Sequence, residues 1–181
     1  MAAAASWLWA RVDTIISAEG APRADWLFVL RHPAHFLAFG GGVGLAPAAP
    51  GTFGTLLAFP LFWALSPWTA PLAWLVLLCA MFVAGIWICG RTGAALGRAD
   101  HGGIVWDEIT AFLLVLFFTP AGMAWQAAAF VVFRAFDILK PPPIRYYERT
   151  LRGGFGVMFD DLLAAFYTLL VLAIARTLTG S

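Results

Sequence analysis

The stretch Ile104-Val105-Trp106-Asp107-Glu108 opens an apolar run that continues over residues 109–118. A charge inside or beside such a run is costly unless it is paired or holds a cation. Two further apolar runs show the same feature: Asp137 lies near the end of one, and Asp160-Asp161 opens the other. We therefore expect the fold to be organised around the place where these acidic ends meet.

The composition is that of a chain whose outer surface faces lipid. It is 62% hydrophobic and 12% charged, with a mean hydropathy of +0.85, whereas soluble domains carry about 25% charged residues. The length of 181 residues and the lack of a long linker predict a single membrane domain over 1–181. The net charge of +1, without a basic block, argues against a nucleic-acid partner.

The N-terminus and the cysteines give no sign of a secreted, disulfide-bonded protein. Residues 1–12 lack a basic start and are interrupted by Arg11, so we expect no signal peptide. Trp7 and Trp9 instead favour an interfacial helix within residues 1–30. Cys79 and Cys89 share one apolar run and form neither a zinc motif nor a disulfide framework.

Apolar runs separated by Pro and Gly predict an all-α, polytopic membrane bundle of about four to five apolar helices. We expect one or two interfacial helices over 25–39 with a break near Pro33. A loop is expected over 40–55, because its glycines and prolines cannot propagate a helix. The apolar helices are expected at 56–65, 72–97, 104–118, 121–139 and 160–179, with a loop and a short helix in 144–157. Several are shorter than the roughly 20 residues that a bilayer core requires.

Chain direction places the polar loops and the acids on one face of this bundle. The turns at the other end, 66–70 and 119–122, are short and uncharged. Ten of the eleven Lys and Arg residues fall on the acidic side, namely Arg11, Arg23, Arg31, Arg91, Arg98, Arg134, Lys140, Arg145, Arg149 and Arg152. The positive-inside rule then places this face in the cytoplasm.

Several carboxylates at one membrane face predict a site for a hard cation such as Mg²⁺, which binds oxygen ligands together with substrate phosphate. The loop ending in Thr52-Phe53-Gly54-Thr55 offers backbone N–H groups ahead of a helix, an arrangement that binds anions. With Arg134 and Lys140 nearby, these features indicate a phosphorylated lipid headgroup as the ligand.

Each element also has a structural interpretation. Asp160 could be an N-cap, Glu108 could complement the helix dipole, and Lys140 could extend from a helix end to the interface. The glycines over 40–44 are weak as a nucleotide fingerprint, because no strand precedes them. Asp137 is different, because an acid near a helix C-terminus faces the unfavourable end of the dipole and requires compensation.

Four stretches of the chain together resemble the phosphatidylglycerophosphatase A family. They are APAAPGTFGT (46–55), DHGGIVWDE (100–108), FRAFDILKP (133–141) and GGFGVMFDD (153–161). The resemblance runs from about residue 32 to 172. Ala111 stands where the family tends to have Gly, and Ala164-Ala165 stands where it tends to have Ala-Gly. Each departure adds only a methyl group, which affects packing more than chemistry.

This resemblance implies an Mg²⁺-dependent phosphatase of the bacterial inner membrane, with its active site facing the cytoplasm among membrane lipids. Its substrate would be phosphatidylglycerophosphate and its products phosphatidylglycerol and phosphate. Residues 1–30 lie outside the resemblance.

We expect Asp107, Asp137 and Asp160 to hold Mg²⁺, with Glu108 and Asp161 as further ligands or a base. Arg134 and Lys140 would neutralise charge on the phosphoryl group. The expected phosphate-binding residues are Gly51, Thr52, Gly54 and Thr55, with His35, Asp100 and His101 in second rank. The attacking group is either a metal-activated water or an aspartate.

Two other classes of function fit parts of the pattern. Membrane carboxylates often mark a transporter or an ion pathway, but transport sites lie near the bilayer midplane at broken helices. A non-catalytic lipid-binding protein would use the anion site and would have no need of so many acids.

Overall fold

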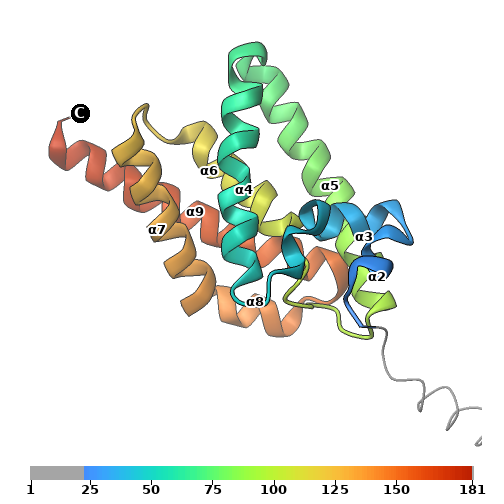
Figure 1. Ribbon diagram of the computed structural model, residues 1–181. Coiled ribbons are helices and arrows are strands. Elements are labelled where there is room, and N and C mark those ends of the chain that lie inside the picture. Colours follow the sequence, from blue (N-terminus) through green and yellow to red (C-terminus); the bar gives the residue numbers. More distant parts are fainter. Residues whose placement is uncertain (1–22, 181) are drawn as a thin grey trace, which may run out of the picture.

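The computed structural model describes residues 23–180, and these residues form helices without a strand among them (Figure 1). The predicted all-α fold is confirmed. The elements in chain order are α2 (Trp26–Leu30), α3 (Pro33–Ala38), η1 (Gly40–Leu45), α4 (Pro50–Leu65), η2 (Ser66–Trp68), α5 (Pro71–Ala95), α6 (Trp106–Phe118), α7 (Met123–Leu139), α8 (Ile144–Thr150) and α9 (Gly153–Thr179). The interfacial helix expected around Trp7 and Trp9 lies outside the described residues.

Two helices begin earlier than the sequence predicts. Pro50 occupies the first turn of α4, where its fixed φ suits a helix and its missing N–H is not needed, so the loop prediction is wrong for 50–55. Helix α9 begins at Gly153 rather than Asp160. Asp160 therefore lies about two turns inside the helix, which excludes its interpretation as an N-cap.

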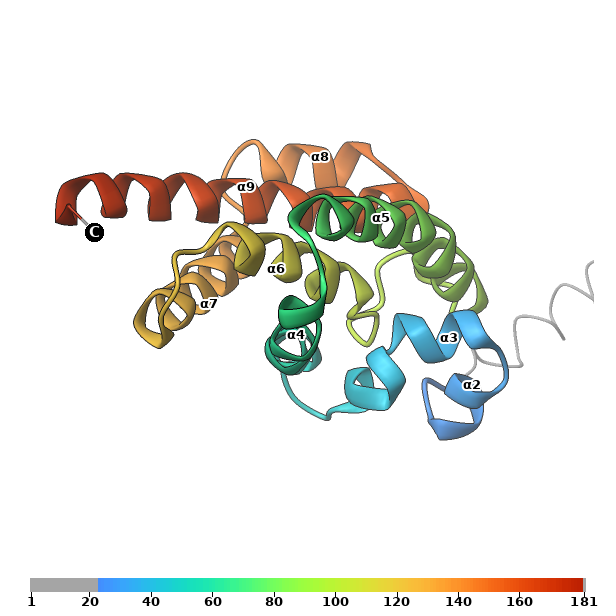
Figure 2. The ribbon, with the colours of Figure 1, turned by 90° about the horizontal axis from the view of Figure 1, so that it is seen from above.

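Helix α6 is the centre of the fold. Its residues Ile109, Phe112, Leu113, Val115 and Leu116 are buried, and the helix packs against α4, α5, α7 and α9. Seen from above, α6 lies between α9 on one side and α4 on the other (Figure 2). The acidic start of α6 is thereby enclosed by its neighbours.

Helix α9 crosses α5 closely near the start of α9. A Cβ on Gly154 would collide with the Ile86 carbonyl oxygen of α5, and one on Gly90 would approach the Gly154 backbone nitrogen to 3.2 Å. Glycine at these positions lets the two backbones meet. This contact fixes the depth at which Asp160 and Asp161 enter the bundle.

The outer surface is strongly apolar, and its large side chains include Leu72, Val83 and Trp87 on α5, exposed by 74%, 67% and 58%. Helices α5 and α9, with 25 and 27 residues, are long and apolar enough to cross a bilayer. Helices α4, α6 and α7 have 16, 13 and 17 residues. At 1.5 Å per residue they span about 24, 20 and 26 Å, less than a hydrocarbon core of about 30 Å. The fold is that of a membrane protein with two helices of full spanning length in the described region.

Candidate active site

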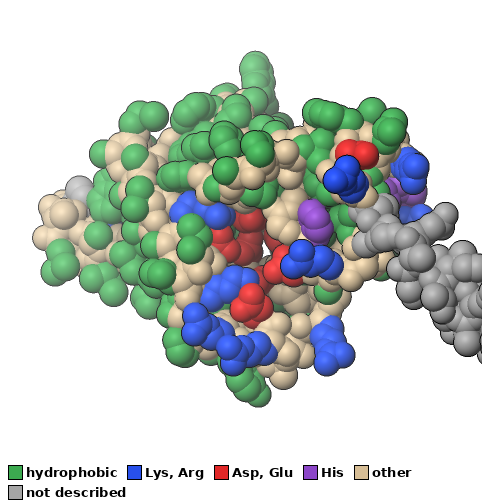
Figure 3. Space-filling view, turned by 60° about the horizontal axis from the view of Figure 1, so that its bottom comes forward, with side chains coloured by type: hydrophobic (Ala, Val, Ile, Leu, Met, Phe, Trp, Pro, Cys, Tyr) green, Lys and Arg blue, Asp and Glu red, His purple; other side chains and the backbone are tan. Residues whose placement is uncertain are grey.

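Acidic side chains from three helices converge at one end of the bundle. Asp107 and Glu108 come from α6, Asp137 from α7, and Asp160 and Asp161 from α9; we call these five residues the acidic cluster. In the view from below, acidic side chains lie in a hollow flanked by Lys and Arg, while apolar side chains cover much of the rest (Figure 3). The structure therefore brings the predicted acids of the three helices to one place.

Within this cluster, Asp107, Glu108 and Asp161 form a tight group, each offering a carboxylate oxygen within 4.8 Å of the others. Among residues 23–180, no hydrogen-bond partner is found for Asp107 Oδ1, Glu108 Oε2 or Asp161 Oδ2, which are all buried. Two full charges about 5 Å apart repel by about 3 kcal/mol at an effective dielectric constant of 20. Three buried carboxylates, each with one oxygen that lacks a hydrogen-bond partner, are hard ligands that suit a divalent cation such as Mg²⁺.

Arg134 links α7 to two other helices across this group. Its Nη1 lies 2.5 Å from Asp137 Oδ2 and 3.9 Å from Glu108 Oε1, and it donates to Thr55 Oγ1 at 3.2 Å. The ion pair with Arg134 supplies the compensation that Asp137 needs near the C-terminus of α7. Arg134 Nε is buried and has no partner within the described part of the chain.

The start of α4 forms one wall beside the acids. A Cβ on Gly51 would collide with Glu108 Oε1, and one on Gly54 would lie 2.6 Å from Val105 Cβ. Thr55 Oγ1 donates to the Gly51 carbonyl oxygen at 2.9 Å. The backbone N–H of Thr52 donates to the Ala49 carbonyl oxygen at 2.9 Å. The close approach of α4 to Glu108 and Val105 therefore depends on glycine at 51 and 54. The Thr52 N–H is already hydrogen-bonded within the first turn of α4.

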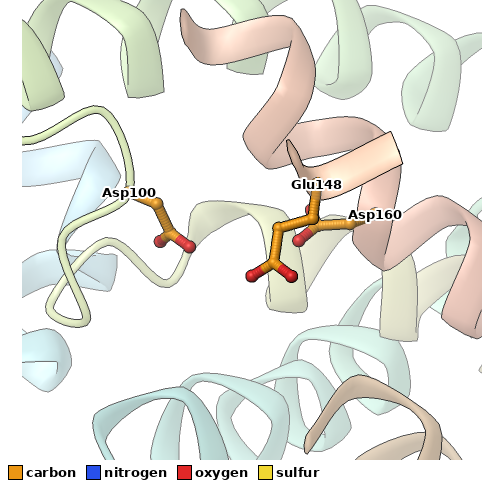
Figure 4. A group of neighbouring side chains, drawn as sticks. All are labelled: Asp100, Glu148 and Asp160. Carbon is orange, nitrogen blue, oxygen red and sulfur yellow. The ribbon is translucent and has the colours of Figure 1, made fainter. Parts of the chain in front are cut away.

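A second acidic group adjoins the first and contains Asp100, Glu148 and Asp160, whose carboxylates approach one another from the 96–105 connection, α8 and α9 (Figure 4). Lys140 Nζ lies 2.6 Å from Asp160 Oδ2 and 2.8 Å from Glu148 Oε1. Burial lowers the pKa of Lys140, but Asp160 and Glu148 outweigh it, so the net shift is upward. Lys140 is therefore charged and supplies the positive partner of this group.

Glu148 is a member of the site that the sequence interpretation missed. It is the sole acid in the basic segment 144–157. A single acid among several arginines was the feature of the sequence that could have indicated Glu148 as a site residue. The contact itself depends on the way α8 folds back onto α9.

The two histidines of second rank have structural contacts of their own. His35 stacks on Phe28 with ring centroids 4.3 Å apart, and its Nδ1 lies 3.1 Å from Thr92 Oγ1. Burial lowers the pKa of His35, and His32 and Arg91 lower it further. The structure thus places His35 in the packing of α2, α3 and α5.

His101 lies in the turn before α6, beside Asp100. Its Nδ1 accepts from the Gly103 backbone N–H at 3.1 Å, which leaves the proton of the neutral ring on Nε2. Burial and the nearby Arg98 lower the pKa of His101, against an opposing effect of Asp100. A neutral ring at pH 7 would attract an anion only weakly.

The family model and two of the similar proteins carry the same name. The sequence model described as Phosphatidylglycerophosphatase A matches residues 36–176. Phosphatidylglycerophosphatase A of Haemophilus influenzae is 44% identical over 144 residues, 78% of this chain and 88% of that protein. The protein of the same name from Escherichia coli is 41% identical over 138 residues, 75% of this chain and 78% of that protein. A putative phosphatidylinositol-3-phosphatase of Bacteroides thetaiotaomicron is 39% identical over 148 residues, 78% and 92% of the two chains. No solved structure matches the chain.

Proposed function

Because the chain belongs to the phosphatidylglycerophosphatase A family, it is a phosphatase that hydrolyses phosphatidylglycerophosphate, and we propose that it does so at the acidic cluster with bound Mg²⁺. The buried, unpartnered oxygens of Asp107, Glu108 and Asp161 carry this proposal. Three carboxylates with oxygens within 4.8 Å of one another carry more negative charge than the single distant contact of Arg134 with Glu108 offsets, so the group is electrostatically unfavourable unless a cation joins it.

We assign Mg²⁺ to Asp107, Glu108 and Asp161. The bound ion would neutralise charge on the phosphoryl oxygens. Asp137 and Asp160 are the ion-pair partners of Arg134 and Lys140 and would not be needed as ligands of the ion. They balance the charge of these two basic residues and hold them beside the reacting group.

Arg134 and Lys140 then act on the substrate phosphate. Arg134 is positioned by Thr55 and Asp137, and its Nε is free to donate to a phosphoryl oxygen. Lys140 adds a second positive charge at the edge of the cluster. In phosphoryl transfer, positioning and charge neutralisation account for most of the catalysis.

We further propose that residues 1–181 form one multi-pass domain of the bacterial inner membrane, with the acidic cluster facing the cytoplasm. Helices α4, α6 and α7 would cross together with α5 and α9, which makes five crossing helices. The sidedness is supported by the basic residues at the acidic end and by the uncharged turns at the opposite end. The shortness of α6 is tolerable because α4, α5, α7 and α9 surround it.

The proposal is tested by phosphate release from phosphatidylglycerophosphate in liposomes containing the purified full-length protein. Asp107→Asn should reduce turnover at least about 100-fold, since Asn keeps the shape but loses the charge that holds the cation. The matched control is Asp25→Asn: Asp25 caps α2 by accepting from Phe28 N, and Asn caps as well as Asp. Near-normal turnover of Asp107→Asn would refute the site assignment.

The same assay with phosphatidylinositol 3-phosphate tests the substrate. The relative from Bacteroides thetaiotaomicron is named for that class of lipid. We expect phosphatidylglycerophosphate to be preferred. A clear preference for the inositol lipid would contradict the proposed substrate.

A further inference from the structure

An apolar cavity of about 270 Å³ lies between α5, α6 and α9. Its walls include Cys79 and Val83 of α5, Leu114 of α6, and Met158 and Leu162 of α9. Neither the metal site nor the phosphate-binding residues use this space. It lies within a part of the fold where the three helices pack directly on one another.

Two of the helices that line the cavity, α6 and α9, also carry residues of the acidic cluster. On α6, Thr110, Ala111 and Leu114 line it, and they follow Asp107 at spacings of three, four and seven residues. Residues at these spacings share one face of a helix. On α9, Met158 precedes Asp161 by three residues. The cavity is therefore in line with the acids on both helices.

Along the axis of α6, the cavity lies farther from the polar end of the bundle than Asp107 does. Leu114 lies seven residues, or about 10 Å, beyond Asp107 along the helix axis. Thr110 does not interrupt the apolar wall, because its hydroxyl donates to the Trp106 carbonyl oxygen at 2.8 Å. A molecule with its phosphate at the acids would thus have its apolar part beside the cavity.

The cavity also opens to the outer surface of the bundle. Cys79 is exposed, and Val83 is exposed by 67%, although both line the cavity. A lipid chain could enter between these residues without any movement of the polar face.

We propose that this cavity holds one acyl chain of the phosphatidylglycerophosphate substrate. The inference rests on the proposed function, since it takes the acidic cluster as the place of the phosphate. In a bilayer the chain gains little by leaving other lipid tails, which are equally apolar. Its effect is on orientation: a seated chain fixes the angle at which the headgroup enters the acidic cluster.

The first test fills the mouth of the cavity and compares two substrates. Cys79→Phe should lower kcat/KM about tenfold for dipalmitoyl phosphatidylglycerophosphate, because a large side chain in a packed apolar site is costly. With the deacylated headgroup, glycerophosphoglycerophosphate, the loss should stay within about twofold, since that substrate has no chain to exclude. The matched control, Ala80→Phe, places the same side chain on the next exposed residue of α5, outside the cavity, and should leave both substrates unaffected. Equal losses on both substrates, or no loss on either, would overturn the proposal.

The second test does not depend on turnover. A phosphatidylglycerophosphate carrying a photoreactive diazirine midway along one acyl chain is irradiated with the full-length protein in liposomes, and the attachment sites are mapped by mass spectrometry. We expect attachment at residues 78–83 and 110–114, reduced by Cys79→Phe. Attachment spread over the outer faces of α5 and α7 would refute the chain site. A protein that shows the expected attachment but releases no phosphate would instead refute the proposed function alone.

Discussion

Replacement of Asp161 by Asn should stabilise the cation-free protein and abolish its response to Mg²⁺. Asp161 is buried, and one of its oxygens lies within 4.8 Å of oxygens of Asp107 and Glu108. The shape of the side chain is retained in Asn, while one of three neighbouring negative charges is removed. The variant should thus be more stable than the unmodified protein without Mg²⁺, and it should lack the stabilisation that Mg²⁺ gives to the unmodified protein.

The magnitude follows from the distances. Removing Asp161 eliminates two repulsive pairs, each of about 3 kcal/mol between full charges about 5 Å apart at an effective dielectric constant of 20. Relaxation and solvent ions reduce this sum, so we expect a gain of about 1 to 2 kcal/mol without Mg²⁺. For a chain of this size 1 kcal/mol corresponds to roughly 2–4 °C, so the Tm should rise by about 4 °C. In the unmodified protein, Mg²⁺ at about 100 times its Kd should contribute about 2.7 kcal/mol, or roughly 8 °C.

The assay is thermal unfolding of the purified proteins in one detergent, with chelator and with Mg²⁺. Asp25→Asn is the control, because it makes the same chemical change at a helix cap remote from the cluster. The reasoning is refuted if Asp161→Asn is less stable than the unmodified protein in chelator. It is also refuted if Mg²⁺ still raises the Tm of the variant by the unmodified amount.

Three further changes test separate parts of the account. Gly51→Ala places a methyl group against a carboxylate oxygen at the start of α6 and should reduce phosphate release at least about tenfold. Gly102→Ala is the control and should not reduce it, because a Cβ on Gly102 would meet open space. Equal activity of the two variants would show that the α4 wall is unimportant. Arg134→Lys keeps the charge but replaces the planar guanidinium, whose Nη1 contacts Glu108, Asp137 and Thr55, by a single ammonium. The kcat should therefore fall about tenfold with membrane insertion intact, and an unchanged kcat would exclude a role at the phosphate. A cysteine at Thr150, in an otherwise cysteine-free protein, should be shielded from an impermeant thiol reagent in intact cells, while one at Ala121 is labelled; the reverse pattern would invert the proposed topology.

The sequence predicted the fold class and the meeting of the acids for a simple physical reason. Apolar runs that carry Asp107, Asp137 and Asp160 at their polar ends alternate in direction, so the acids must lie at one end of any up-and-down bundle. Composition predicted the apolar exterior in the same way. The fold class, the meeting of the acids and the apolar exterior all follow from the order of apolar and polar segments along the chain, which can be read directly from the sequence.

The grouping of the acids could not be predicted, because it depends on how the helices cross. The sequence interpretation joined Asp107, Asp137 and Asp160 around one ion. The structure places Asp107 with Glu108 and Asp161, and Asp160 with Glu148 and Asp100. This division arises from the early start of α9 and its close contact with α5, which rest on tertiary packing.

Two helix boundaries show where local rules competed. Glycine content argued for a loop before Thr55, but Pro50 at the first turn of α4 and the packing of Gly51 and Gly54 against α6 favour a helix there. Asp160 looked like a helix cap, although Gly153, at a φ of 68°, precedes it as the actual start. In both places packing outweighed the propensity of single residues.

The most direct test of the central claim is to measure Mg²⁺ binding by calorimetry and phosphate release from phosphatidylglycerophosphate on one chelator-treated preparation of the full-length protein. The account predicts no release before Mg²⁺ is added, half-saturation of binding and of activity at the same Mg²⁺ concentration, and loss of both in Asp107→Asn. Full phosphate release by the chelator-treated protein, or unchanged Mg²⁺ binding by Asp107→Asn, would contradict it.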